Sequence, residues 1–247
     1  MQAYDRRFYD LLSDTAQPSA RIVLPIVLEL APIASAVDLG CGNGGWLSVL
    51  HELGVEDVLG LDGDWVALDQ LRIARERFRR VRLDAPIDLD RRFDLAISLE
   101  VAEHLPPERA SGFVATLCDL APLVLFSAAI PDQGGLNHVN EQWPAYWAAL
   151  FQRHGYRPID VIRPAVWENP AVTWWYKQNL LLFADPAAIA ASPPLAAAAA
   201  RSPAVPPALV HPELYTQAVR SGRPSLGRWL RMAPAALARS RAKSRAR

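Results

Sequence analysis

A glycine-rich segment near the start of the chain constrains the fold more than any other feature. A short apolar stretch over residues 36–39 leads into the sequence Gly40-Cys41-Gly42-Asn43-Gly44-Gly45. A second apolar segment, over residues 46–53, follows it directly. Glycine allows the backbone to adopt a positive φ and to approach a ligand closely. The pattern predicts a strand, a ligand-binding loop and a helix whose first amide groups face the ligand.

The rest of the chain repeats this alternation of apolar strands and longer helical segments. Seven strands are expected, over residues 36–39, 58–61, 81–83, 93–99, 123–127, 159–163 and 179–183. Helical segments are expected over residues 1–33, 46–53, 108–118 and 143–154, and the end of a charged helix over 72–80. The alternation predicts an α/β fold with a doubly wound, mostly parallel seven-stranded sheet. The last two strands are close enough in sequence to form an antiparallel pair at one edge.

Charge is distributed unevenly, although the 247 residues include 26 basic and 26 acidic side chains. Nine of the basic residues and none of the acidic ones lie from Arg220 onward, which leaves a net charge of −9 on residues 1–219. An acidic body disfavours polyanions, so nucleic acid is not the expected partner. The basic residues 225–247 are expected to form a solvated tail or an amphipathic segment that contacts a membrane surface or nucleic acid.

Composition also predicts the domain layout and the compartment. Residues 1–185 are expected to form one domain, followed by an Ala- and Pro-rich linker over 186–224 and the basic tail. The two cysteines, Cys41 and Cys118, are too few for a disulfide framework. The charged start does not resemble a secretory signal, and no apolar stretch has the length of a membrane span. A cytoplasmic location is therefore expected.

Acidic residues stand at or near the ends of four predicted strands, namely Asp38, Asp62, Asp84 and Glu100. In an open parallel sheet, ligands bind beyond these ends. The G-x-G-x-x-G spacing of dinucleotide sites is also present, at Gly40, Gly42 and Gly45, so a nicotinamide-dependent oxidoreductase is an alternative. The carboxylate of Asp38 would repel a pyrophosphate, whereas it would attract a ligand that carries an ammonium and a sulfonium group.

Residues 37–44, Val-Asp-Leu-Gly-Cys-Gly-Asn-Gly, resemble the glycine-rich signature of class I S-adenosylmethionine-dependent methyltransferases. The resemblance implies a Rossmann-like methyltransferase fold and S-adenosylmethionine as the cofactor. It places Asp38 near the methionine amino group, Asp62 at the ribose hydroxyls and Asp84 at the adenine amine. The implied cofactor-binding residues are Asp38, Gly40, Cys41, Gly42, Asp62, Gly63, Asp84 and Leu99. Helix capping by Asp62 and ordinary turn formation by Asp84 are the structural alternatives.

A second constellation, Glu100-x-x-Glu103-His104, follows the fourth predicted strand, and His138 follows the fifth. One helical turn would place the first three side chains on the same face, beside the methyl-donor pocket. The four residues resemble the metal cluster of ubiquinone-biosynthesis O-methyltransferases and of small-RNA 3′-terminal 2′-O-methyltransferases. That resemblance implies Mg²⁺, Mn²⁺ or another divalent ion. Two interpretations without a metal stay open: His104 or His138 acts as a general base, or the Glu-His pair only begins a helix.

Residues 126–131, 134–135, 138–141 and 174–179 resemble a bacterial methyltransferase subgroup associated with polysaccharide and secondary-metabolite gene clusters. Five tryptophans are expected to form an aromatic wall for a sugar or flat acceptor, or to pack the late elements: Trp143, Trp147, Trp167, Trp174 and Trp175. The predicted function is methyl transfer to a hydroxyl of a small molecule or saccharide, with His104, His138 and Glu100 as catalytic residues. The alternatives are the oxidoreductase and a degenerate methyltransferase fold that only binds.

Overall fold

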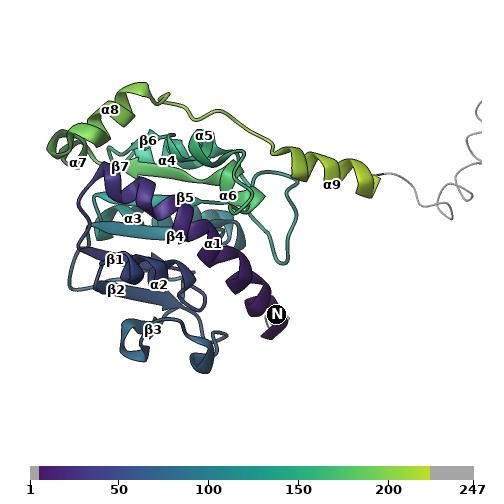
Figure 1. The fold of residues 1–247 in the computed structure, drawn as a ribbon, viewed down its shortest axis with the longest axis horizontal. Helices are drawn as coiled ribbons and strands as arrows, with labels where there is room; N and C mark the ends of the chain where they lie inside the picture. The colour runs from purple at the N-terminus through teal and green to yellow at the C-terminus, as the bar shows by residue number, and fades with distance from the viewer. Residues whose placement is uncertain (1–5, 223–247) are drawn as a thin grey trace, which may run out of the picture. The chain divides into compact units, whose positions relative to one another are not determined.

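A computed structural model describes residues 6–222, and within them the side chains of residues 15–220. The chain divides into two compact units, Met1–Leu209 and Val210–Arg247. The first unit contains the sheet and the helices α1 to α8 (Figure 1). In the second unit the described residues form the helix α9 (Pro212–Gly222). The predicted basic tail, residues 225–247, lies outside the described part of the chain.

The sheet has the strand order β3-β2-β1-β4-β5-β7-β6. Its strands are β1 (Ser35–Leu39), β2 (Asp57–Asp62), β3 (Phe78–Arg80), β4 (Leu95–Leu99), β5 (Leu123–Ser127), β6 (Arg157–Ile159) and β7 (Leu181–Ala184). Neighbouring strands are parallel, except that β7 runs antiparallel to both β5 and β6. The predicted doubly wound, mostly parallel sheet with an antiparallel pair at one edge is confirmed. The antiparallel strand is the second from that edge.

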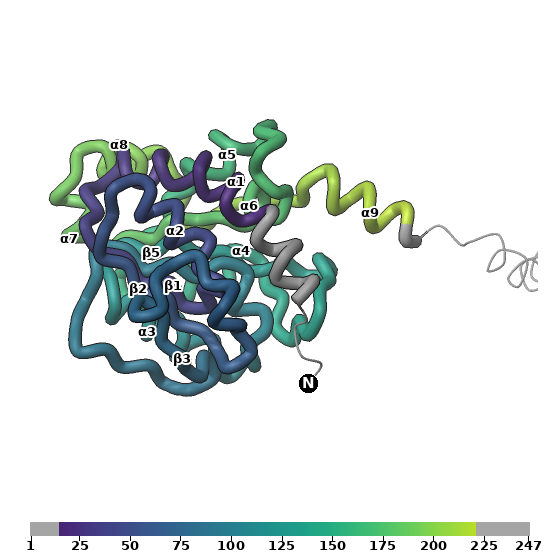
Figure 2. Tube along the Cα trace, turned by 60° about the horizontal axis from the view of Figure 1, so that its bottom comes forward, coloured from purple at the N-terminus to yellow at the C-terminus, as the bar shows by residue number. Residues whose placement is uncertain are grey.

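Helices cover both faces of the sheet (Figures 1 and 2). One core lies under α1 (Arg6–Leu30), α2 (Gly45–Glu52), α5 (Ile162–Val166), α6 (Trp174–Asn179) and α8 (Pro193–Arg201). The other lies under α3 (Ala110–Leu120) and α4 (Pro144–Gln152). Alternation along β1 produces the two cores, because Ala36 faces the first and Val37 the second. Among the described residues, no helix combines the length and the hydropathy of a membrane span.

Two short helices follow β7 where the sequence predicted a linker. Each has a side-chain cap and a proline in its first turn: Asp185 accepts from the amide of Ala188 before α7 (Pro186–Ala191), and Ser192 caps α8 in the same way. Leu195 of α8 is fully buried. The boundary therefore lies at Leu209 rather than at residue 185, and the linker prediction is wrong for residues 186–209. The alanine run of α8 resembles a low-complexity segment in the sequence. Its small side chains allow α8 to pack against α1.

The segment around the third strand differs from the prediction. Instead of a helix to residue 80 and a strand over 81–83, the chain forms two 3₁₀ turns, Leu68–Gln70 and Arg75–Arg77, and then β3 over Phe78–Arg80. This edge strand is mostly exposed, so its sequence carries no hydrophobic alternation. Near the other edge, the strand predicted over 159–163 ends at Ile159 and gives way to α5. The loop predicted to follow it contains α5 and α6.

Candidate functional site

The predicted site residues gather where the strand order reverses, between β1 and β4. A doubly wound sheet binds its ligands at such a switch point, beyond the carboxyl ends of the strands. The glycine loop leaves β1 at this point, and Glu100 follows the end of β4. The site has two parts. The cofactor half comprises Asp38, Gly40, Cys41, Gly42, Asp62 and Gly63, and the histidine cluster comprises Glu103, His104 and His138.

The glycine loop is packed tightly at one position and open at another. Gly40 has a φ of +87°, and its amide donates to the carbonyl of Leu61 over 2.8 Å. A Cβ atom at this position would lie 2.4 Å from a methyl group of Val101, so only glycine fits. At Gly42, with a φ of +55°, a Cβ atom would meet nothing within 4 Å. The loop is therefore anchored at Gly40 and leaves room for a ligand at Gly42.

Two buried carboxylates define the electrostatics of the cofactor half. Asp62 accepts hydrogen bonds from the amides of Gly42 (2.7 Å) and Gly63 (2.6 Å) and from the side chain of Trp65. Burial raises the pKa of Asp62, although these donors oppose the rise. Burial, and then the charge of Asp62, raises the pKa of Asp38 well above its ordinary value. No arginine or lysine among the described residues contributes to either shift, so a cationic ligand would stabilise both carboxylates.

Three further residues of the predicted cofactor set have different surroundings. Burial raises the pKa of the Cys41 thiol well above its usual value, so Cys41 is not an activated nucleophile. Leu99 is buried at the end of β4. Asp84 is largely exposed and forms an ion pair with Arg82 (2.8 Å), which lowers its pKa. It follows the end of β3 by four residues, and its contact with adenine stays a prediction.

The histidine cluster forms just beyond β4 and β5. A 3₁₀ turn over Ala102–His104 follows β4, and it brings Glu103 and His104 to the loop that carries His138. Ligand atoms from these three residues lie within 4.8 Å of one another. The carboxylate of Glu103 is fully buried, and no side chain among the described residues donates to either of its oxygens. Burial, followed by the charge of Glu100, raises its pKa well above the ordinary value, and the backbone amides of Glu103 and Ala129 oppose the rise only in part.

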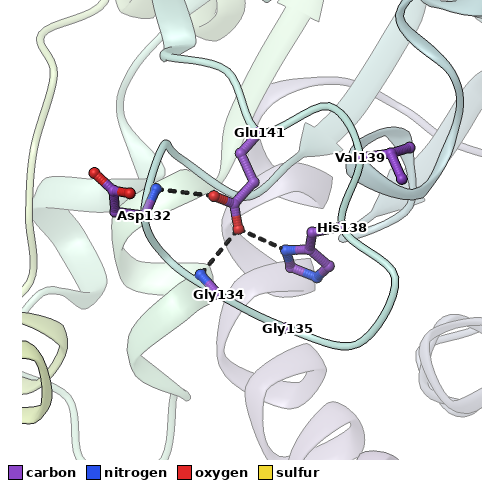
Figure 3. A pocket seen from close by; sticks show the side chains of 6 residues that line it. All are labelled: Asp132, Gly134, Gly135, His138, Val139 and Glu141. Atoms are coloured by element: carbon purple, nitrogen blue, oxygen red, sulfur yellow. Dashed lines mark hydrogen bonds and ion pairs between the residues drawn. The ribbon is translucent and has the colours of Figure 1, made fainter. Parts of the chain in front are cut away.

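Both histidines of the cluster are held in place. Nδ1 of His138 lies 2.9 Å from Oε1 of Glu141 (Figure 3). Oε1 also accepts from the amide of Gly134 (2.9 Å), and Oε2 accepts from the amide of Asp132 (2.8 Å). Burial, followed by the charge of His138, lowers the pKa of His104 to about 4, so this imidazole is neutral near neutral pH. A pocket opens beside the cluster and is lined by Asp132, Gly134, Gly135, His138, Val139 and Glu141.

Glu100, the fourth predicted metal ligand, does not belong to this three-residue group. Its carboxylate accepts hydrogen bonds from the side chains of Gln133 and Asn179. The sequence pattern indicated no role for these residues or for Gln178. The one available signal was the 174–179 segment, which carried a family resemblance without a function. The predicted aromatic wall is wrong for Trp147, which is 2% exposed and packs in the core beneath α4.

Residues 6–168 match the family model described as a methyltransferase domain. The chain is 33% identical over 101 residues to the ribosomal protein L11 methyltransferase of Thermosipho africanus (strain TCF52B), a match that covers 38% of this chain and 36% of that protein. An O-methyltransferase family protein from Burkholderia thailandensis has a similar structure, with a TM-score of 0.52, 14% identity and coverage of 74% of this chain and 60% of that one. Human N-acetylserotonin methyltransferase, solved in complex with SAM, gives a TM-score of 0.50, 16% identity and coverage of 72% and 55%.

At 14% and 16% identity, the two solved structures establish the fold alone. The chain also spans less than two thirds of the length of each of these three proteins. The family model, in contrast, covers more than half of the chain and includes the whole glycine loop and the 3₁₀ turn of the histidine cluster. The chain belongs to the methyltransferase domain family, and its fold is that of the class I S-adenosylmethionine-dependent methyltransferases.

Proposed function

We propose that the chain transfers a methyl group from S-adenosylmethionine to a hydroxyl oxygen of a small molecule or saccharide, with a divalent ion held by Glu103, His104 and His138. One observation carries this proposal: the Glu103 carboxylate is fully buried, and no side chain among the described residues donates a hydrogen bond to either oxygen. Burial of an uncompensated carboxylate is costly, and a bound cation offsets that cost.

The cofactor half fits a cationic cofactor. S-adenosylmethionine supplies, when bound, a methyl group on a positively charged sulfur; the acceptor oxygen would bond to the methyl carbon as the carbon–sulfur bond breaks, which leaves S-adenosylhomocysteine and releases the hydroxyl proton to solvent. Asp38 would bind its ammonium group, and Asp62 would accept both ribose hydroxyls, as a carboxylate can. Gly42 leaves space at the loop for the methionine part. A nicotinamide dinucleotide would add a pyrophosphate beside two buried acids, so its charge argues against the oxidoreductase alternative.

The histidine cluster fits a first-row divalent ion. One carboxylate and two imidazoles suit Mn²⁺ better than Mg²⁺, which prefers oxygen ligands. Because Nδ1 of His138 pairs with Glu141, Nε2 is left to bind the ion, an arrangement common for metal-binding histidines. His104 is neutral near neutral pH, as a ligand must be. A bound divalent ion lowers the pKa of a coordinated hydroxyl and so favours its reaction with an electrophilic methyl group.

The pocket beside the cluster indicates the charge of the acceptor. Its lining includes the acids Asp132 and Glu141, and no arginine or lysine is among its lining residues. A polyphosphate or nucleic-acid acceptor would therefore be repelled. An uncharged hydroxyl acceptor is the better fit. Alignment of that hydroxyl with the methyl group would supply much of the rate enhancement, because the cofactor is already activated by its charge.

A methyl-transfer assay with and without chelator tests the proposal. Purified full-length chain is incubated with labelled S-adenosylmethionine and with catechol and monosaccharide acceptors. Chelation is expected to abolish transfer and Mn²⁺ to restore it. Glu103→Gln should lose activity by about tenfold or more, whereas Glu108→Gln, at an exposed position five residues later, serves as the matched control. Chelator-resistant transfer by a protein that contains no divalent ion would refute the metal.

A metal-free general base is the second candidate mechanism, and the pairing of His138 with Glu141 favours it. A carboxylate that holds one imidazole nitrogen orients the other toward the proton to be removed. Activity that survives chelation but is lost in His138→Gln would support this mechanism. Binding of S-adenosylhomocysteine without transfer to any acceptor would support a binding module instead. No binding of S-adenosylhomocysteine at all would refute the enzyme.

A further inference from the structure

Glu100 lies in an environment that differs sharply from that of Glu103, three residues later. Its φ is +55°, a left-handed conformation that is strained for a residue other than glycine. Its amide donates to both the carbonyl oxygen (3.0 Å) and Oγ (3.1 Å) of Ser127. The strained conformation and these two hydrogen bonds therefore fix the position of the Glu100 backbone at the end of β4.

Two side-chain amides, those of Gln133 and Asn179, bind the Glu100 carboxylate, and Gln178 bonds to both of them; we call these three residues the carboxamide bracket. Nδ2 of Asn179 donates to Oε1 over 3.0 Å, and Nε2 of Gln133 donates to Oε2 over 2.9 Å. Oε1 of Gln133 accepts in turn from Nδ2 of Asn179 and from Nε2 of Gln178, each over 3.0 Å. Gln178 and Asn179 are almost fully buried. Both oxygens of Glu100 thus have hydrogen-bond donors within the protein.

We propose that the carboxamide bracket holds Glu100 outside the metal-ligand set and directs it to the acceptor, so that three residues bind the ion. This inference rests on the proposed function, because it takes the histidine cluster as a metal site. The two carboxylates differ in the required way: no side chain donates to Glu103, whereas side-chain amides donate to both oxygens of Glu100 and hold it outside the group whose ligand atoms lie within 4.8 Å of one another. Each carboxylate oxygen has two lone pairs, so these bonds fix Glu100 and still leave it able to accept a hydrogen bond from an acceptor hydroxyl.

A buried arginine side chain holds the backbone of the carboxamide bracket in place. Arg163 is fully buried and forms a two-pronged ion pair with Asp160, with distances of 2.8 and 2.5 Å. Its Nη1 also donates to the carbonyl oxygens of Gln178 and Pro207, each over 3.1 Å. A guanidinium group is planar and rigid, so these contacts set the position of the end of α6. Arg163 thereby links the carboxamide bracket to Pro207, in the segment that follows α8.

The bracket leaves Glu100 suited to bind an acceptor hydroxyl. Its donors are neutral, so they hold the carboxylate without cancelling its charge. The next residue, Val101, lies against Gly40 of the glycine loop, and Glu103 of the histidine cluster follows two residues after Val101. Glu100 therefore lies between the cofactor half and the histidine cluster, where the acceptor hydroxyl has to stand. There its carboxylate would orient the hydroxyl by accepting a hydrogen bond, and Gln133 and Asn179 act as positioning residues.

A Co²⁺ titration of the full chain, followed by visible absorption, tests the ligand set, because the cobalt bands report coordination geometry. Glu100→Gln is expected to keep the wild-type affinity within about twofold and the wild-type spectrum, while Glu103→Gln loses about tenfold or more. Asn179→Ala is expected to change the spectrum, because the released Glu100 gains access to the ion. Adding Glu100→Gln to that variant should restore the wild-type spectrum. Asn169→Ala is the matched control, since its side chain accepts only a backbone amide in a loop.

Each contrary outcome identifies a different error. If Glu100→Gln loses as much cobalt affinity as Glu103→Gln, Glu100 is a ligand and the inference is overturned, while the proposed function stands. If Asn179→Ala has the wild-type spectrum, the bracket does not position Glu100. If the wild-type chain binds no cobalt, the metal site of the proposed function fails, and this inference fails with it.

Discussion

Replacement of Glu103 by glutamine is expected to stabilise the metal-free chain at alkaline pH. The wild-type carboxylate has no exposed surface and no side-chain hydrogen-bond donor on either oxygen, and only the backbone amides of Glu103 and Ala129 favour its charged form. A buried polar group without a partner costs about 1–3 kcal/mol, and a charged one costs more. An amide of the same shape removes the charge but still needs partners, so we expect a gain of about 2 kcal/mol in the free energy of unfolding. For a chain of this length, that gain corresponds to a rise of about 4–8 °C in Tm.

The sign of the pH dependence follows from the raised pKa of Glu103. In the folded chain this carboxyl keeps its proton at pH values where the unfolded chain has already lost it. Its favourable contribution is complete below the ordinary pKa of 4.5 and is lost as the pH rises through the folded value. Glutamine does not titrate. The advantage of the variant in Tm should therefore be small near about pH 5 and grow toward about pH 8.

Differential scanning calorimetry in chelator, repeated with Mn²⁺, measures both effects. Mn²⁺ should raise the Tm of the wild-type chain and leave that of Glu103→Gln nearly unchanged, because a ligand stabilises only a folded state that binds it. Glu108→Gln, an exposed neighbour, controls for the loss of one negative charge. A variant that melts below wild type at about pH 8 in chelator would show that the buried carboxylate is compensated within the protein and would refute the reasoning.

Three further predictions address the cofactor half and the domain. Asp62→Ala should weaken S-adenosylhomocysteine binding in calorimetry by about 10- to 100-fold, since charged hydrogen bonds contribute about 1.5–3 kcal/mol. Asp64, whose side chain is 91% exposed, provides the control, because Asp64→Ala should leave the affinity unchanged. Equal affinities of the two variants would contradict the role assigned to Asp62. Gly40→Ala should lower the free energy of unfolding in urea by about 1–3 kcal/mol more than Gly54→Ala. Both positions have positive φ, but only Gly40 lacks space for a methyl group. Equal losses would argue against a clash between that methyl group and Val101. Leu195→Ala should cost about 2–5 kcal/mol, and a negligible loss would show that α8 is not part of the core.

The central strands were predictable because their signals are local. The strand before the glycine loop and the strand over residues 123–127 are short, mostly apolar and bounded by turn residues, and the structure places them within one residue of the prediction. The prediction misplaced the edge strand β3, because this strand is mostly exposed and its sequence lacks the alternation of apolar and polar residues. The helices after residue 185 were missed although Asp185-Pro and Ser192-Pro are ordinary helix starts. Their alanines were taken as low complexity.

The histidine cluster was predictable and the carboxamide bracket was not, for a topological reason. Parallel strands β4 and β5 end at the same edge, so residues that follow them come together. The end of α6 reaches Glu100 only because β7 runs antiparallel beside β5, which pairs Leu181 with Phe126 near the carboxyl end of β5. Side-chain amides also have no characteristic spacing in a sequence. Nothing short of the strand order indicates that Asn179 meets Glu100.

The treatment of buried acids within this one chain supports a functional role for those at the sheet edge. The side chain of Asp160 is 7% exposed, and the chain neutralises it with Arg163, whose side chain is fully buried. Asp38 and Glu103 are at least as buried, yet no arginine or lysine of the described residues contributes to their pKa shifts. A chain that pairs a structural acid with arginine has the means to pair these two as well. Their missing positive charges are expected to come from ligands: an ammonium and sulfonium group at Asp38, and a divalent ion at Glu103.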